Sequence, residues 1–367
     1  MKNIKKMKKV SIKLTTIPLL MSLCSFKVNN DYDKELVNNI FTSLTYMDEG
    51  FKGSSISTPI KLIDNNDQSC LLFKTYLNNK YTGYFILDNN YELLISHVDS
   101  LDYYQDVEDY YYLTDIFTIS KDRKEITSKS NVKIRNIINK SSSYLDDVSL
   151  ADTYDNVLKT YSSSYGSSMY IEGVPSYYNS PDEKYVVFPG GGCVPTAAAM
   201  LLSFYDRNCS YFSSLYTPDL PLNHDEDVDR VNSVIKELGN DMLINSEGGV
   251  PDNRTVTGIS TYLIEHGKQA FKADYYCSQT ANAMDSNDVI GLSSSFIARK
   301  NIALLGIDSN YSSNKQFVED HVVVLTGYGN YQYVGASLYV NFGWSSRFNN
   351  YNISPKAVYS FMFIRNN

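Results

Sequence analysis

Short apolar runs alternate with turn-forming residues in the first third of the chain. The runs at residues 71–77, 84–87 and 91–95 have strand length and consist largely of Leu, Ile, Phe and Tyr. Asparagine and aspartate residues at 78–79 and 88–90 separate them, and these residue types favour tight turns. The pattern predicts a meander of strands with flanking helices.

The second half of the chain shows helical spacing first and strand-like runs last. Apolar residues recur along one stripe over residues 194–205, which predicts a helix. A second helix is expected at residues 257–266, before Gly267. Strand-like runs follow at residues 302–305, 321–325, 338–342 and 357–364. This order of elements predicts an α+β domain.

Between these two parts, serine, aspartate and tyrosine replace the regular apolar spacing. The change is clearest at residues 141–143 and 161–168, as expected for a linker or an exposed, cleavable loop. We therefore expect a small α+β domain at residues 27–150 with a linker that extends to about 183. A larger α+β domain is expected at residues 183–367.

The first 26 residues have the pattern of an export signal. Six lysines precede the mostly apolar stretch at residues 17–26, and no acidic residue is present. This stretch is about half as long as a membrane-spanning helix requires, so we expect no stable membrane span. The protein is expected to be secreted or at the cell surface. Lipid attachment at Cys24 and a basic N-terminus of a cytosolic protein are the alternatives, and the bulky Leu23 argues against the former.

Charge and composition narrow the possible partners. The chain has 33 basic and 41 acidic residues, a net charge of −8, which becomes −14 without the six lysines of residues 1–26. An acidic body without a basic stripe argues against nucleic acid as a partner. The five cysteines and four histidines show no metal-binding spacing, so we expect neither a metal nor another cofactor. For Cys209 and Cys277, a disulfide and two buried thiols both remain open.

Cys193 is the first candidate for chemistry. It follows the glycine run at residues 190–192 and precedes the helix predicted at residues 194–205, so its sulfur is expected at a helix N-terminus. Unpaired N–H groups and the helix dipole favour a thiolate there. Gly192 allows a substrate backbone to approach closely, and Pro195 is acceptable in a first helical turn. A small buried cysteine is the alternative.

His321 and Asn341 are the second and third candidates. His321 begins one predicted strand and Asn341 ends the next, and the midpoint between them falls in the turn-like residues 328–331. An antiparallel hairpin folded there would place His321 beside Asn341, whose side-chain oxygen would orient the imidazole. Trp344 is the only tryptophan and would shield that hydrogen bond from water. The alternative is a polar strand end with a structural histidine.

Three segments resemble papain-fold bacterial cysteine peptidases. These are residues 192–205, 321–328 and 339–344, and the streptopain family is the most similar, followed by the peptidases that cut double-glycine leaders. The resemblance implies a papain-like cysteine peptidase domain, in which the helix that carries the nucleophile packs on an antiparallel sheet.

The resemblance also implies a role for each candidate residue. Cys193 would be the nucleophile, His321 the general base and then acid, Asn341 the orienting residue and Trp344 the shield. Residues 84–96 resemble the inhibitory propeptide of streptopain-like enzymes, so the N-terminal domain would act as an intramolecular inhibitor. The chain departs from papain itself, because the stretch at residues 185–192 contains no glutamine for an oxyanion hole; backbone N–H groups would have to serve.

Together these features predict a secreted cysteine endopeptidase made as a latent precursor, or zymogen. It would hydrolyse peptide bonds of a protein or peptide substrate through a thioester on Cys193, with His321 as base and acid. One alternative is a papain-fold amide or acyl transferase that acts on a non-protein substrate. A catalytically inactive surface-binding protein is the other.

Overall fold

The computed structural model describes the chain from residue 32 onward, with gaps. The described residues are 32–63, 69–98, 111–113, 119–120, 157–178, 188, 192–244, 250–277, 284–307, 321–343 and 351–367. The expected export signal, Trp344 and part of the expected linker lie outside them. Residues Lys34–Asn367 form one compact unit.

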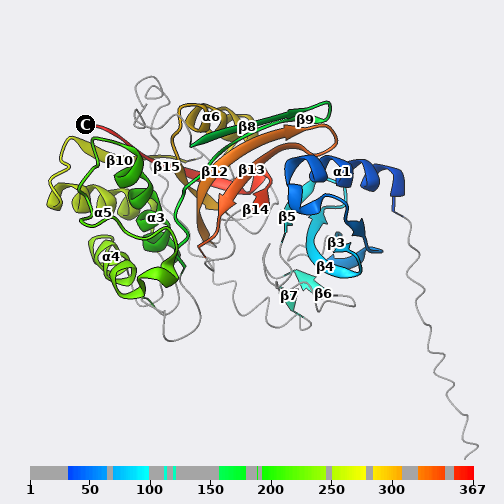
Figure 1. Cartoon of the computed structure of the whole chain (residues 1–367), viewed down its shortest axis with the longest axis horizontal. Coiled ribbons are helices and arrows are strands. Elements are labelled where there is room, and N and C mark those ends of the chain that lie inside the picture. Colours follow the sequence, from blue (N-terminus) through cyan, green and yellow to red (C-terminus); the bar gives the residue numbers. More distant parts are fainter. Residues whose placement is uncertain are drawn as a thin grey trace, which may run out of the picture. The chain divides into compact units, whose positions relative to one another are not determined.

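A large sheet, almost entirely antiparallel, organises this unit. Within the described ranges its strands follow the order β10-β15-β11-β12-β13-β14-β5-β4-β3-β2-β6-β7, while β1 pairs with β3, and β9 joins β8 to β12. Among the described strand pairs, only β2 and β6 run parallel. The α+β class expected from the sequence is therefore confirmed (Figure 1). The strands are β1 (Ser55–Ile56), β2 (Ile60–Ile63), β3 (Ser69–Leu77), β4 (Lys80–Leu87), β5 (Leu93–His97), β6 (Tyr111–Leu113), β7 (Ile119–Ser120), β8 (Leu158–Ser163), β9 (Gly166–Ile171), β10 (Phe271–Cys277), β11 (Ala303–Ile307), β12 (His321–Tyr331), β13 (Gly335–Asn341), β14 (Tyr351–Ile353) and β15 (Val358–Asn366).

Five α-helices accompany the sheet in the described part of the chain. They are α1 (Lys34–Met47), α3 (Cys193–Asn208), α4 (Val228–Asp241), α5 (Asp252–Glu265) and α6 (Ser286–Ala298), together with the short 3-10 helices η1 (Glu49–Phe51), η4 (His224–Glu226) and η5 (Pro355–Ala357).

The N-terminal meander forms as predicted, by β3, β4 and β5 in antiparallel order. Asn78 and Asn79 adopt positive φ at the first turn, which asparagine tolerates better than most residues. Phe85 stacks on Phe73 at 4.9 Å and on Phe41 of α1 at 5.8 Å. These aromatic contacts fix α1 over the meander.

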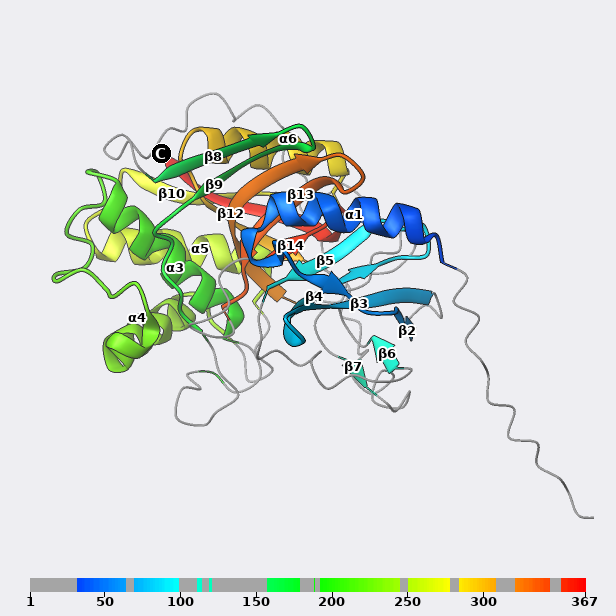
Figure 2. The same ribbon diagram turned by 45° about the vertical axis from the view of Figure 1, so that its right-hand side comes forward.

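The C-terminal strands carry helices on both faces (Figures 1 and 2). On β15, Ser360 hydrogen-bonds Asp252 at the start of α5, while the next residue, Phe361, contacts Phe296 of α6. Successive residues of a strand point to opposite faces, so α5 and α6 cover opposite faces. Both α3 and α4 contact α5 and lie on the same face of the sheet as α5.

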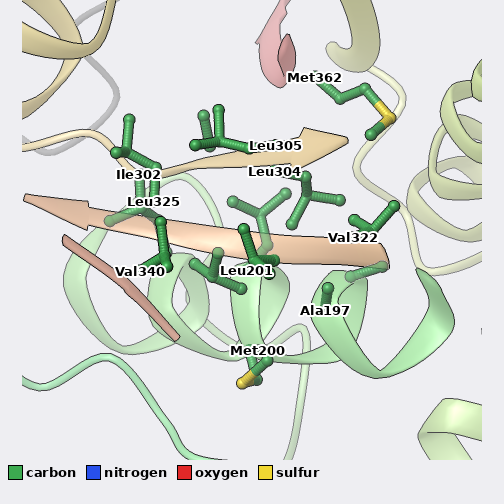
Figure 3. Packing of buried hydrophobic residues seen from close by; sticks show 14 of the residues in the cluster. Ala197, Met200, Leu201, Ile302, Leu304, Leu305, Val322, Leu325, Val340 and Met362 are labelled. Atoms are coloured by element: carbon green, nitrogen blue, oxygen red, sulfur yellow. The ribbon is translucent and has the colours of Figure 1, made fainter. Parts of the chain in front are cut away.

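Buried apolar side chains fix α3 against β12 (Figure 3). Ala197 and Leu201 of α3 lie along the strand that carries Val322. Alanine permits the helix to approach the sheet closely, and Leu201 is 1% exposed. Burial of one such leucine contributes about 1.5–3 kcal/mol. The helix expected to carry the nucleophile is therefore packed on an antiparallel sheet.

The structure differs from the composition-based expectation at residues 161–168. These residues belong to the β8–β9 hairpin, and β9 pairs with β12 from Gly327 to Tyr331. Tyrosine favours strands, and Gly166, with φ of +151°, accommodates the turn between them. This part of the expected linker is thus a pair of sheet strands. No helix among the described residues is long and apolar enough to cross a membrane.

Candidate functional site

Cys193 is the first residue of α3, as the sequence predicted. Gly192 is its N-cap; it supplies no side-chain cap, and its carbonyl accepts a hydrogen bond from Thr196 N at 3.0 Å. Cys193 is half-buried, whereas Cys70 and Cys209 are buried thiols. Among the described cysteines, Cys193 alone combines partial exposure with a helix N-terminus.

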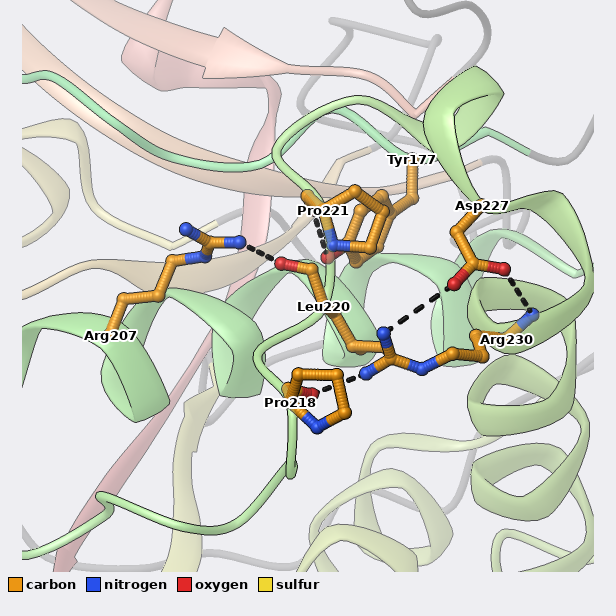
Figure 4. Close-up of polar contacts among 7 residues, drawn as sticks. All are labelled: Tyr177, Arg207, Pro218, Leu220, Pro221, Asp227 and Arg230. Atoms are coloured by element: carbon orange, nitrogen blue, oxygen red, sulfur yellow. Dashed lines mark hydrogen bonds and ion pairs between the residues drawn. The ribbon is translucent and has the colours of Figure 1, made fainter.

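Polar contacts fix the segment that flanks α3 (Figure 4). The Tyr177 hydroxyl is 2.9 Å from Ser203 Oγ on α3 and 2.7 Å from the Pro221 carbonyl. Arg207 donates to the Leu220 carbonyl. These bonds tie residues before and after the helix to its body.

Arg230 of α4 binds the loop between α3 and α4 that contains Pro218, Leu220 and Pro221 (Figure 4). It donates to the Pro218 carbonyl and forms an ion pair with Asp227 at 3.4 Å. Asp227 also caps α4, because its carboxylate accepts from Arg230 N. The exposed ion pair itself contributes little to stability, so the loop depends mainly on the hydrogen bonds to its carbonyls.

His321 begins β12, as expected, and is 8% exposed. Its Nε2 lies 2.7 Å from the carbonyl oxygen of Phe342. A carbonyl only accepts hydrogen bonds, so Nε2 carries the proton and Nδ1 holds the lone pair of the neutral ring. Burial lowers the pKa of His321 to about 4, although the Phe342 carbonyl favours the charged form. The imidazole is therefore neutral at physiological pH.

The neutral imidazole argues against an ion pair between a Cys193 thiolate and a protonated His321. A thiolate paired with a protonated His321 would require a histidine pKa well above 4, and burial opposes this. In the described state His321 suits a general base, which needs an unprotonated nitrogen.

Asn341 ends β13, but its side chain does not contact His321. It donates to the Pro175 carbonyl at 3.2 Å and accepts from Gly343 N at 3.0 Å. The expected hydrogen bond is replaced by the one from His321 to Phe342.

The strand register explains this difference. Asn341 pairs with Val324, because the β12–β13 turn lies at residues 332–334 rather than 328–331, and because a bulge interrupts the ladder between Leu325 and Gly327. Asn330 remains inside β12, opposite Ala336. Asn341 is thus three residues away from the position opposite His321.

Gly343 links the start of α3 to this end of the sheet. A Cβ atom added at Gly343 would lie 3.4 Å from Thr196 Cγ2 and 3.2 Å from Met200 Cε. Gly343 follows Phe342, whose carbonyl holds His321. The first turns of α3 and the start of β12 therefore lie at the same end of the sheet. The φ of +67° at Gly343 also favours glycine there.

The two candidate groups approach that end from different faces. Val324 pairs with Asn341 and shares with it the face that α3 covers. Regular alternation directs His321 to the other face, where its ring stacks on Phe342 at 5.5 Å. The thiol and the imidazole can meet only around the end of β12, which begins at His321.

An aromatic row extends from His321 into the N-terminal meander. Phe342 contacts Tyr351 of β14 edge-to-face at 4.5 Å, and Tyr351 stacks on His97 of β5 at 3.8 Å. Sequence spacing gave no signal for Tyr351 or His97, because their contact joins strands more than 250 positions apart. Phe342 lies within residues 339–344, which were singled out from the sequence. Its hydrogen bond with His321 is made by a backbone carbonyl, which every residue type has, so no sequence pattern could mark it.

Trp344, predicted to shield the His321 and Asn341 pair, lies outside the described residues. No group of three potential metal ligands occurs among the described histidine, cysteine, aspartate and glutamate residues. His224 serves the fold, because its Nδ1 accepts from Tyr178 N at 3.1 Å and its Nε2 lies 3.1 Å from Asn232 Oδ1.

No protein-family model matches the sequence, and no curated protein matches it significantly.

Proposed function

We propose that this protein is an exported cysteine endopeptidase with a papain-like arrangement, made as a latent precursor. The observation that carries the proposal is the contact of Gly343 with the first turns of α3, because it places the half-buried Cys193 at the same end of the sheet as His321. Three sequence features agree with it: the Cys, His, Asn order, the glycines before Cys193, and the resemblance of three segments to streptopain-like peptidases.

In the proposed reaction His321 Nδ1 accepts the thiol proton as the Cys193 sulfur attacks the scissile carbonyl carbon. The protonated imidazole then gives that proton to the leaving amine, and the acyl group stays on sulfur as a thioester. Water next attacks the thioester with His321 again as base, and the acid product leaves as the thiol is restored. Backbone N–H groups at the start of α3 would stabilise the oxyanion.

The positions of Phe342 and Asn341 suggest how the base would be held. The Phe342 carbonyl fixes the Nε2–H tautomer, which leaves Nδ1 as the accepting nitrogen. Asn341 would act indirectly, because it binds Gly343 N and so fixes the peptide next to that carbonyl. Asn341 is then a positioning residue for Phe342 rather than a direct partner of His321.

Latency would come from the N-terminal domain. Its β5 strand pairs with β14, and His97 on β5 stacks on the aromatic row that ends at His321. A domain attached at this place is close enough to the proposed site to control access, and its covalent link gives it a high effective concentration.

Hydrolysis of casein by purified protein tests the proposal. Before the assay the precursor is incubated, and the N-terminus of any new fragment is sequenced. We expect Cys193→Ala and His321→Ala to lose activity by about 10³-fold or more, because each removes a reacting group. Cys70→Ala is the matched control, since Cys70 is a buried thiol in the meander.

Two results would overturn the assignment. Near-normal hydrolysis by Cys193→Ala would show that the thiol is not the nucleophile. Failure of iodoacetamide to modify Cys193 faster than Cys70 and Cys209 in the folded protein would favour the structural role of that cysteine.

A further inference from the structure

The C-terminal part of the chain, residues 157–367, holds residues 34–98 at two separate places. We call residues 34–98 the N-terminal segment and residues 157–367 the C-terminal segment. The first place is the turn end of the β12–β13 hairpin, which binds α1. The second is the edge of β14, which binds β5. Both lie entirely within the described residues.

At the first place, tyrosines of the hairpin cap the C-terminal end of α1. The Tyr331 hydroxyl donates to the Tyr46 carbonyl at 3.3 Å, and the Tyr339 hydroxyl donates to the Met47 carbonyl at 3.1 Å. The last carbonyls of a helix have no partner inside it, so these two hydroxyls satisfy groups that α1 cannot. In the other direction Ser43 Oγ donates to the Gln332 carbonyl at 2.5 Å.

The second place combines a sheet ladder with a ring contact. Ser96 and Ile95 of β5 pair with Asn352 and Ile353 of β14. Ser354 N donates to the Leu94 carbonyl at 3.2 Å. Tyr351 stacks on His97 with 11° between the ring planes.

Apolar burial accompanies the polar contacts of α1. The helix packs against β9 and β12 of the C-terminal segment as well as over the meander of its own segment, and its Val37, Ile40 and Leu44 are at most 1% exposed. Separation of the two segments would break the packing of α1 on β9 and β12, exchange two hydrogen bonds to helix carbonyls for bonds to water, and expose the edge of β14. Each of these costs free energy in water. The contacts between the segments thus combine helix packing, a sheet ladder, a ring contact and hydrogen bonds.

We propose that the N-terminal segment stays bound to the C-terminal segment after the chain between them is cut, as a non-covalent subunit. This inference rests on the proposed maturation only for its biological setting, because the contacts themselves do not depend on peptidase activity. None of them involves residues 121–156, so a cut there removes no contact described above. Cleavage alone would then leave the His97 and Tyr351 contact in place beside the proposed site.

The test uses the full chain with Cys193→Ala and a recognition sequence for a site-specific protease in place of residues 141–143. The cut and uncut proteins are compared by size-exclusion chromatography at micromolar concentration, and the peak fractions are analysed by mass spectrometry. We expect both fragments in one peak at the elution volume of the uncut chain. Two separate peaks would overturn the proposal.

Removal of single hydroxyl groups tests whether these contacts, rather than non-specific association, retain the N-terminal segment. Tyr331→Phe and Tyr339→Phe remove the hydroxyls that cap α1, and each should weaken fragment binding by about 5- to 10-fold. The Tyr331 hydroxyl also lies 3.0 Å from Ser168 Oγ within the C-terminal segment. Tyr333→Phe is the matched control, because Tyr333 lies in the turn of the same hairpin and is 45% exposed. Equal dissociation constants in all three variants would refute the assigned contacts.

The two proposals can fail separately. Co-elution of the Cys193→Ala fragments, together with no casein hydrolysis by the wild-type protein, would overturn the function and leave the interface standing. Separated fragments with an active enzyme would do the reverse.

Discussion

Protonation of His321 should destabilise the folded protein, and the size of this effect follows from the structure. Burial lowers the pKa of His321 to about 4, from 6.5 for an ordinary histidine. Between these values the unfolded chain binds the proton that the folded chain rejects, so the free energy of unfolding falls as the pH is lowered. Above about pH 6.5 the ring is largely neutral in both the folded and the unfolded chain, so His321 no longer makes the free energy of unfolding depend on pH.

The pKa difference gives the expected magnitude. A pKa of about 4 in the folded state corresponds to a loss of about 2 kcal/mol between pH 7 and pH 5, and of about 3 kcal/mol by pH 4. Urea unfolding at several pH values measures this loss, with Cys193→Ala as the background so that the chain stays intact. Other titratable groups of the chain also contribute to the pH dependence of the free energy of unfolding. A second variant separates their contribution from that of His321.

His321→Gln in the same background is that control. Glutamine can still donate an amide hydrogen to the Phe342 carbonyl, but it does not titrate. We expect the stability of this variant to fall about 2 kcal/mol less than that of its parent between pH 7 and pH 5. Parallel curves for the two proteins would refute the lowered pKa and, with it, the neutral imidazole.

The ionisation can also be observed directly. The chain contains four histidines, so selective isotope labelling gives few imidazole signals, and His321→Gln identifies the one that disappears. That signal should change only near pH 4. A transition near 6.5 would show that the site is more hydrated than the structure indicates.

The remaining predictions concern residues around the candidate base and can be measured by urea unfolding and by casein hydrolysis. Asn341→Ala should lower the free energy of unfolding by about 2–4 kcal/mol, because it leaves the Pro175 carbonyl and Gly343 N without their buried partner; unchanged stability would contradict this. Gly343→Ala should reduce hydrolysis more than binding of substrate, since a Cβ there crowds Met200 and Thr196 and displaces the Phe342 carbonyl; wild-type kcat would contradict it. Leu201→Ala should cost about 2–5 kcal/mol, and a smaller loss would mean that α3 can collapse into the cavity.

Helix and strand positions were predictable because their signals are local. The glycine run, Cys193 and the apolar stripe that follows are adjacent in the sequence, and α3 begins at Cys193. The apolar run that begins at His321 likewise became the start of β12. Such elements need only the spacing of apolar residues and the residues that interrupt it.

The contacts of His321 were not predictable, because register depends on features without a residue-type signature. The turn is centred at residue 333, two residues beyond the expected midpoint, and together with the bulge after Leu325 this places Asn341 opposite Val324. Each one-residue shift in register moves a side chain to the other face, so an estimate from the hairpin midpoint fails even when both strands are right. The partner that results is a backbone carbonyl, which any residue supplies.

The sequence predicts two domains, an inhibitory one and a catalytic one, but the sheet is continuous between the two parts of the chain. Composition changes between the two parts, yet the sheet continues from β14 into β5, and the ring of His97 stacks on Tyr351. Tyr351 in turn contacts Phe342, the residue that both stacks on His321 and holds its Nε2. The N-terminal segment is thus part of the wall behind the candidate base. Because burial is what lowers the pKa of His321, docking of that segment and ionisation of the base are expected to be linked, and loss of the segment should favour the protonated imidazole.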